Sequence, residues 1–225
     1  MNEVKLKLIE AEKKAAFLFN QIDKRGLIAP GKSEDVLNKE IFNLAYELYG
    51  IKKYWHKRIV RAGKNTLKPY NENPQNLIIQ QDDILFIDFG PIFDEWEADY
   101  GRTYVIGVDE LKIKLKNDIS SAWDDCKDFF NSQKHITGAE FYNYAFNLAK
   151  DYGWEFGGEI AGHLIGHFPH EKLDKEDKTN YVHPNNHIDM NALDKSGNRR
   201  DWILEIHFVN KEKEIGGFFE QLLTN

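Results

Sequence analysis

Residues 84–107, ILFIDFGPIFDEWEADYGRTYVIG, contain two segments that predict neighbouring strands. Residues 84–88 form a short apolar run typical of a buried strand, and residues 102–107 predict a second strand after a turn. Asp88 ends the first segment and Asp99 precedes the second, so antiparallel pairing would bring both carboxylates to one point. A buried carboxylate is costly unless a partner such as a cation compensates its charge. The pair therefore indicates a candidate metal site, although aspartates at strand ends more often cap a strand or face solvent.

Helical patterns lie on both sides of this strand pair. Apolar residues recur at helical spacing over residues 4–22, and Ser33 is placed to cap a second helix that Gly50 ends. Thr137 and Glu140 form the sequence signature of a capping box, which predicts the start of another helix. The remaining predicted elements are a helix over 111–129, strands at 57–63, 202–209 and 217–223, and loops at 64–80 and 171–200.

The order of these elements predicts the fold class. Two helices lead into strands, two further helices follow, and strands end the chain, which predicts an α+β fold. We expect one catalytic domain over residues 1–225, with residues 1–50 as a helical lead-in.

Composition excludes several classes of protein. The 225 residues include 30 Lys and Arg against 37 Asp and Glu, a net charge of −7 that argues against a nucleic-acid binder. A single cysteine, Cys126, excludes an internal disulfide. No segment approaches the roughly 18 apolar residues of a membrane span, and the charged N-terminus lacks the apolar core of a signal peptide. We expect a cytoplasmic protein that binds neither nucleic acid nor membrane.

Basic and aromatic residues are interleaved over residues 52–64. Given the acidic net charge, this segment predicts a solvated face or an anchor for a substrate carboxylate.

A histidine-rich segment forms the second candidate site. His163, His167 and His170 fall within eight positions and are flanked by glycines and apolar residues. Imidazole is the commonest neutral metal ligand and a proton carrier near neutral pH. A solvent-exposed histidine-rich loop is the alternative, but apolar neighbours such as Leu164 and Ile165 argue against it.

Two glutamates in the C-terminal strands form the third candidate site. Glu205 lies in WILEIHF and Glu220 in GGFFEQLL, each between apolar residues. A single glutamate in a strand usually faces solvent, but two in successive strands are less easily explained in this way.

These residues together resemble the pita-bread metallopeptidases, which include methionine aminopeptidase, aminopeptidase P and prolidase. The resemblance rests on the order Asp, Asp, His, Glu, Glu, on the eleven positions between Asp88 and Asp99, and on the segment from His163 to Glu171. It covers the chain from about residue 50 onward and implies a curved, mostly antiparallel sheet covered by helices.

The resemblance also implies a centre with two divalent metal ions. Asp88, Asp99 and Glu220 would hold one ion, while Asp99, His163, Glu205 and Glu220 would hold the other. This oxygen-rich set suits Mn, Co, Zn or Fe. Glu205 is the expected acceptor of the proton from the attacking water. His170, the other expected catalytic residue, matches a family histidine that contacts the substrate, and a supporting role beside the ligands is the alternative.

Several positions depart from the family pattern. Ile206 replaces the proline that normally follows the first glutamate, and Phe218 replaces an arginine of aminopeptidase P and prolidase. Phe219, an aromatic residue before the last glutamate, agrees with methionine aminopeptidases. The substrate histidine expected four or five positions after Asn65 is absent, because Pro69 and Tyr70 stand there. We expect the substrate pocket to include these four residues: Trp55, His56, Tyr70 and His167. Plain packing is the alternative for Trp55 and His56.

The sequence therefore predicts a metal-dependent aminopeptidase or dipeptidase that cleaves the first bond of a peptide substrate, with Xaa-Pro peptides as one candidate class. Methionine removal, hydrolysis of a non-peptide amide, and a non-catalytic binding module are the alternatives. A homodimer is left open.

Overall fold

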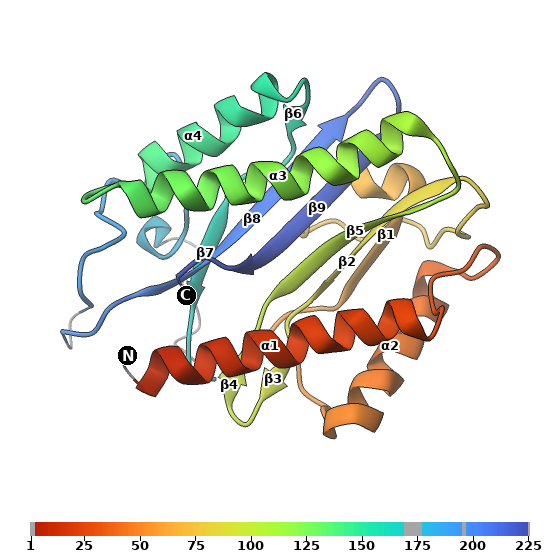
Figure 1. Ribbon diagram of the computed structural model, residues 1–225, viewed down its shortest axis with the longest axis horizontal. Helices are drawn as coiled ribbons and strands as arrows, with labels where there is room; N and C mark the ends of the chain where they lie inside the picture. The colour runs from red at the N-terminus through yellow and green to blue at the C-terminus, as the bar shows by residue number, and fades with distance from the viewer. Residues whose placement is uncertain (1–2, 169–176, 195–196, 225) are drawn as a thin grey trace.

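The computed structural model describes residues 3–168, 177–194 and 197–224. In these ranges, helices lie beside a strongly twisted sheet (Figure 1). The helices are α1 (Glu3–Lys24), α2 (Glu34–Tyr49), α3 (Glu110–Ser132) and α4 (Gly138–Asp151), with short 3-10 turns η1 (Gly63–Leu67) and η2 (Lys178–Asn180). The strands are β1 (Ile59–Ala62), β2 (Asp83–Phe89), β3 (Ile92–Phe93), β4 (Trp96–Glu97), β5 (Tyr100–Ile106), β6 (Glu155–Phe156), β7 (Gly162–Ile165), β8 (Asp201–Asn210) and β9 (Ile215–Leu222).

The main sheet is antiparallel throughout the described residues. Its order is β1-β2-β5-β9-β8-β6, and β7 also pairs with β8. Strands β3 and β4 form a separate hairpin between β2 and β5. The α+β class and the helix-covered antiparallel sheet predicted from sequence are confirmed.

Two apolar clusters attach the helices to the sheet. Leu85 and Ile87 of β2 pack with α1 and α2, while Leu204 and Phe208 of β8 pack with α3 and α4. Figure 1 shows α1 and α2 beside the first strands and α3 and α4 beside the last ones. Side chains alternate between the faces of a strand, so the residues between these apolar ones point away from the helices. Asp88, which follows Ile87, and Glu205, which follows Leu204, therefore lie on the face without helices.

Local signals located the helices well. The Ser33 side chain accepts a hydrogen bond from the Val36 amide, and Gly50 ends α2 with a φ of 68°. Thr137 and Glu140 form the predicted capping box. No helix in the described part of the chain is long and apolar enough to cross a membrane.

The strands were predicted less completely. Strand β1 is shorter than the predicted 57–63, and η1 occupies the start of the predicted 64–80 loop. Strand β7, which contains His163, was not predicted as a strand, because Gly162 and His163 interrupt the apolar pattern of this short segment. Part of the predicted loop at 171–200 lies outside the described residues.

Candidate metal centre

The register of the sheet brings carboxylates from three strands to one face. Asp88 of β2 is opposite Gly101 of β5, Gly101 is opposite Glu220 of β9, and Glu220 is opposite Glu205 of β8. Directly paired residues of antiparallel strands project to the same face. Asp99 is two positions before Gly101 and shares that face by the period of the strand.

His163 reaches the same face from β7. It pairs with Ile203, which is two positions before Glu205 in β8. The side chains of His163 and Glu205 therefore project to the same face, toward the other carboxylates. Gly162 has a φ of 140°, and a Cβ there would overlap the backbone carbonyl of Ile203. This glycine therefore permits the close approach of β7 to β8.

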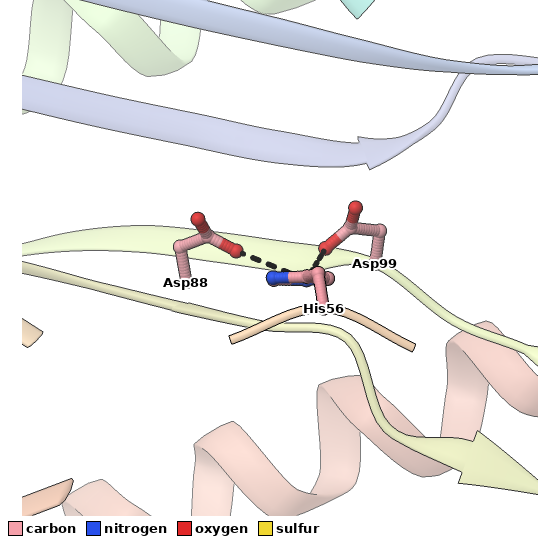
Figure 2. A group of neighbouring side chains, drawn as sticks. All are labelled: His56, Asp88 and Asp99. Atoms are coloured by element: carbon pink, nitrogen blue, oxygen red, sulfur yellow. Dashed lines mark hydrogen bonds and ion pairs between the residues drawn. The ribbon is translucent and has the colours of Figure 1, made fainter. Parts of the chain in front are cut away.

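Asp99 lies between two histidines. Its Oδ2 is 3.2 Å from His163 Nε2, and its Oδ1 is 3.0 Å from His56 Nε2. His163 Nε2 is also 3.7 Å from Glu220 Oε1, and His56 Nε2 is 3.6 Å from Asp88 Oδ1. Figure 2 shows the His56 ring between the two aspartates. Two groups of potential ligand atoms thus share one carboxylate: His56, Asp88 and Asp99, and Asp99, His163 and Glu220.

The carboxylates are buried and incompletely satisfied. Asp99 and Glu220 are each 2% exposed and Asp88 is 7% exposed. Asp88 Oδ1 and Glu220 Oε2 accept no hydrogen bond among the described residues. Buried acceptors without partners are rare and costly. A cation would satisfy these oxygens, so the residues present fit a metal centre.

The pKa values show the same excess of negative charge. Burial raises the pKa of Asp88 to about 7, although His56 opposes the rise. Burial and the charges of Asp99, Asp88 and Glu205 raise the pKa of Glu220 well above its usual value. Burial also acts to raise the pKa of Asp99, but His56 and His163 outweigh it and hold that pKa well below its usual range. The two histidines compensate Asp99, and the other carboxylates repel one another.

Two glycines leave room at this face. A Cβ on Gly101 would lie 2.6 Å from Phe218 Cδ1 and 3.0 Å from Glu220 Cβ. A Cβ on Gly90 would overlap the His56 ring and the Trp55 indole. Gly90, the last residue of LFIDFG, is therefore required, because a side chain there would displace the loop that carries His56.

The predicted residues differ in how close they lie to this cluster. Asp88, Asp99, His163 and Glu220 come together as described, and the half-buried Glu205 lies directly opposite Glu220. Burial raises the pKa of Glu205, while His163 opposes the rise. That these five bind metal stays a prediction.

The predicted pocket residues have separate surroundings. The ring centroids of Trp55 and His163 are 5.0 Å apart, and those of Tyr70 and His56 are 5.9 Å apart. His167 packs against Trp96 of the β3–β4 hairpin at 5.1 Å. Their contact with substrate stays a prediction. His170 lies outside the described residues.

The sequence placed His56 in the substrate pocket and missed its contact with the aspartates. The segment before β1 has no periodic pattern that fixes its path. Its position depends on the amide of Trp55, which donates to the Gly90 carbonyl at 3.0 Å, and on the bridge between Tyr54 and Pro91. In the sequence, the one signal of the contact between His56 and the aspartates is Gly90, because a larger residue there would overlap the His56 ring.

The comparison with protein families decides the assignment. The model of metallopeptidase family M24 matches residues 7–193. The chain belongs to metallopeptidase family M24. The match includes Asp88, Asp99 and His163 and ends before Glu205, so the sheet register alone connects the two glutamates to the site. The resemblance inferred from the sequence is confirmed.

Solved structures of M24-type enzymes share the fold. A prolidase from Thermococcus sibiricus is 23% identical, with a TM-score of 0.71 over 97% of this chain and 59% of that one. An X-Pro aminopeptidase from Thermotoga maritima is 18% identical, with a TM-score of 0.73 over 100% of this chain and 62% of the other. A methionine aminopeptidase from Rickettsia prowazekii is 16% identical, with a TM-score of 0.70 over 100% of both chains. This M24 chain spans about three-fifths of the length of the first two.

At these identities the likeness establishes the fold and leaves the substrate open. No curated protein matches the chain.

Proposed function

We propose that this M24 protein is a dinuclear metal-dependent aminopeptidase or dipeptidase that hydrolyses the N-terminal bond of short peptides. The observation that carries the proposal is the position of Asp99. Its two oxygens face different histidines, 3.0 Å from His56 and 3.2 Å from His163. A carboxylate with its oxygens divided in this way is arranged to bridge two cations.

The remaining carboxylates supply ligands on both sides of Asp99. In this proposal Asp88, Asp99 and Glu220 hold one ion, and Asp99, His163, Glu205 and Glu220 hold the other. Two bound divalent ions would polarise the scissile carbonyl and stabilise the charge that develops on it. The oxygen-rich set suits Mn, Co, Zn or Fe.

Glu205 is the proposed proton acceptor. It is half-buried and opposite the buried Glu220, so it is the more accessible of the two glutamates. Burial raises its pKa, which brings a carboxylate closer to the range suited to a general base. Glu205 would take the proton of the attacking water and pass it to the leaving amine.

Two substrate classes are candidates. Xaa-Pro peptides are one class, because prolidase and X-Pro aminopeptidase structures are among those that share the fold. Phe218 argues against Xaa-Pro peptides, because it stands where proline-specific relatives are expected to have arginine, and its ring centroid lies 5.2 Å from that of Phe86. Phe219, the aromatic residue before Glu220, favours peptides that begin with methionine. Trp55 and Tyr70 would line the substrate pocket for either class of peptide.

Metal content and activity measured together test this proposal. The protein is purified without chelator, its metals are counted by elemental analysis, and the apoprotein is reloaded with Mn or Co. Xaa-Pro, Met-Ala and mixed dipeptides are then assayed. We expect about two ions per chain and metal-dependent cleavage.

The possible outcomes are distinct. A preferred peptide names the subclass. Two bound ions without cleavage of any peptide would contradict the peptidase proposal and favour a non-peptide amide. No bound metal after reloading would contradict the enzymatic proposal and favour a binding module.

A further inference from the structure

We propose that His56 is a sixth protein ligand of the metal centre, coordinating through Nε2 the ion that Asp88 and Asp99 share. The inference rests on the proposed dinuclear function and adds an imidazole to a half of the centre that otherwise has only carboxylates. It assigns His56 to the metal in place of the substrate pocket predicted from the sequence.

The two histidines of the site have the same hydrogen-bond arrangement. His56 Nδ1 is 2.7 Å from the carbonyl oxygen of Lys57, and His163 Nδ1 is 2.8 Å from that of Leu164. A carbonyl only accepts, so Nδ1 donates in both rings. In each ring Nε2 is then the nitrogen directed at Asp99. Metal-binding histidines are typically oriented by such a bond from the other ring nitrogen.

The distances are within about 0.2 Å of those between atoms that coordinate one cation. His56 Nε2 is 3.0 Å from Asp99 Oδ1 and 3.6 Å from Asp88 Oδ1. Ligand atoms about 2.1 Å from a common metal are roughly 3.0–3.4 Å apart in octahedral or tetrahedral geometry. The corresponding distances from His163 Nε2 are 3.2 Å to Asp99 and 3.7 Å to Glu220. The two histidines thus occupy equivalent positions about the shared carboxylate.

The unsatisfied oxygen of this half lies beside His56. Asp88 Oδ1 has no hydrogen-bond partner in the described part of the chain and lies 3.6 Å from His56 Nε2. The Asp88 side chain is 10% exposed and that of His56 is 8% exposed. A metal bound between these atoms would satisfy both.

The loop that carries His56 is held in place before any ligand binds. Trp55 Nε1 donates to the carbonyl of Ala98 at 3.1 Å, next to Asp99. The Trp55 ring is 4.5 Å from the His56 ring and 5.0 Å from the His163 ring. The His56 ring also packs directly over Gly90, which has no side chain to displace it, and together these contacts preorganise His56.

A histidine that acted only as a counter-ion to the aspartates would behave differently. It would have to leave the carboxylates when a cation replaced its charge. X-ray absorption distinguishes the two cases, because imidazole bound to a metal gives a characteristic outer-shell scattering. We would compare the Co-loaded protein with His56→Ala and with His187→Ala, a control at an exposed histidine.

We expect two imidazoles per two Co ions in the parent and the control, and one in His56→Ala. Calorimetric titration of the apoproteins with Co should show one site weakened by about 10- to 100-fold in His56→Ala, with the other changed much less. Free imidazole should restore binding in His56→Gly. Circular dichroism of each apoprotein checks that the variants fold.

Gly90→Ala provides a second variant that keeps the histidine. Its Cβ would displace the ring, so the same site should weaken. One imidazole per two Co ions in the parent, or unchanged binding in His56→Ala, would overturn the role of His56 and leave the dinuclear peptidase intact. A parent that binds no Co would overturn both proposals.

Discussion

Glu205 and Glu220 face each other directly across β8 and β9, and Gly101 of β5 lies opposite Glu220. Gly101 has no side chain, and the Phe218 ring fills the space that a Cβ at this position would need. Charged residues of the same sign at opposed positions destabilise a sheet. The sheet therefore carries a local instability at this face, which a bound cation would relieve.

The first prediction follows for Glu220→Gln. Burial and neighbouring carboxylates raise the pKa of Glu220 in the folded state, so the folded chain holds this proton more tightly than the unfolded one. Stability of the apoprotein should then fall as pH rises above about 4.5, the usual pKa of the group. Gln carries no charge, so we expect the Glu220→Gln apoprotein to be more stable than the parent at pH 8.

Urea unfolding of both apoproteins at pH 5 and pH 8 checks this prediction. The variant should also lose metal binding, since it lacks a ligand. A variant that is less stable than its parent at pH 8 would show that the carboxylates do not repel one another.

The second prediction concerns Gly101→Ala. Its Cβ would lie 2.6 Å from Phe218 Cδ1 and 3.0 Å from Glu220 Cβ, which forces the site to move. Overpacking of this kind costs roughly 1–3 kcal/mol of stability, and we expect weaker metal binding with it. Thermal unfolding and Co titration measure both effects. Adding Phe218→Leu should recover part of the stability, and no recovery would place the strain elsewhere.

The third prediction is that metal stabilises the folded chain. A ligand that binds only the folded state contributes about 2.7 kcal/mol at 100 times its dissociation constant. We expect Mn or Co to raise the Tm of the apoprotein and EDTA to reverse the change. His163→Ala should reduce the increase in Tm, whereas His187→Ala should leave it unchanged. An equal increase in both variants would argue against binding at the centre.

The fourth prediction concerns Glu12, on the helix side of the sheet. Burial raises the pKa of its carboxyl to about 8, with Arg102 opposing the rise. The folded state binds this proton more tightly than the unfolded state, so stability should fall as pH rises from about 4.5 to about 8.

Glu12→Gln should flatten this part of the pH profile by up to about 5 kcal/mol. The Glu12 side chain accepts a hydrogen bond from the Leu222 amide, which Gln can also accept. Urea unfolding of metal-free protein from pH 5 to pH 9 measures the change. An unchanged profile would show that Glu12 is solvated in the folded state.

Much of the helical structure was predictable because its causes are local. Ser33, Gly50 and Thr137 act on backbone groups within four residues, so the sequence contains the whole cause of each helix end. Strand β7 was missed for the opposite reason. Gly162 and His163 form a strand only because β8 is present to pair with them.

The sequence by itself determined which residues were available for a metal centre. It supplied Asp88, Asp99, His163, Glu205 and Glu220, together with the apolar periodicity that forms the helices and strands. Only the tertiary structure decided that these side chains share a face and that His56 joins them at Asp99. Strand register and the path of the loop before β1 depend on pairings between residues far apart in the chain. A shift of one residue in any pairing would turn a carboxylate to the helix-covered face.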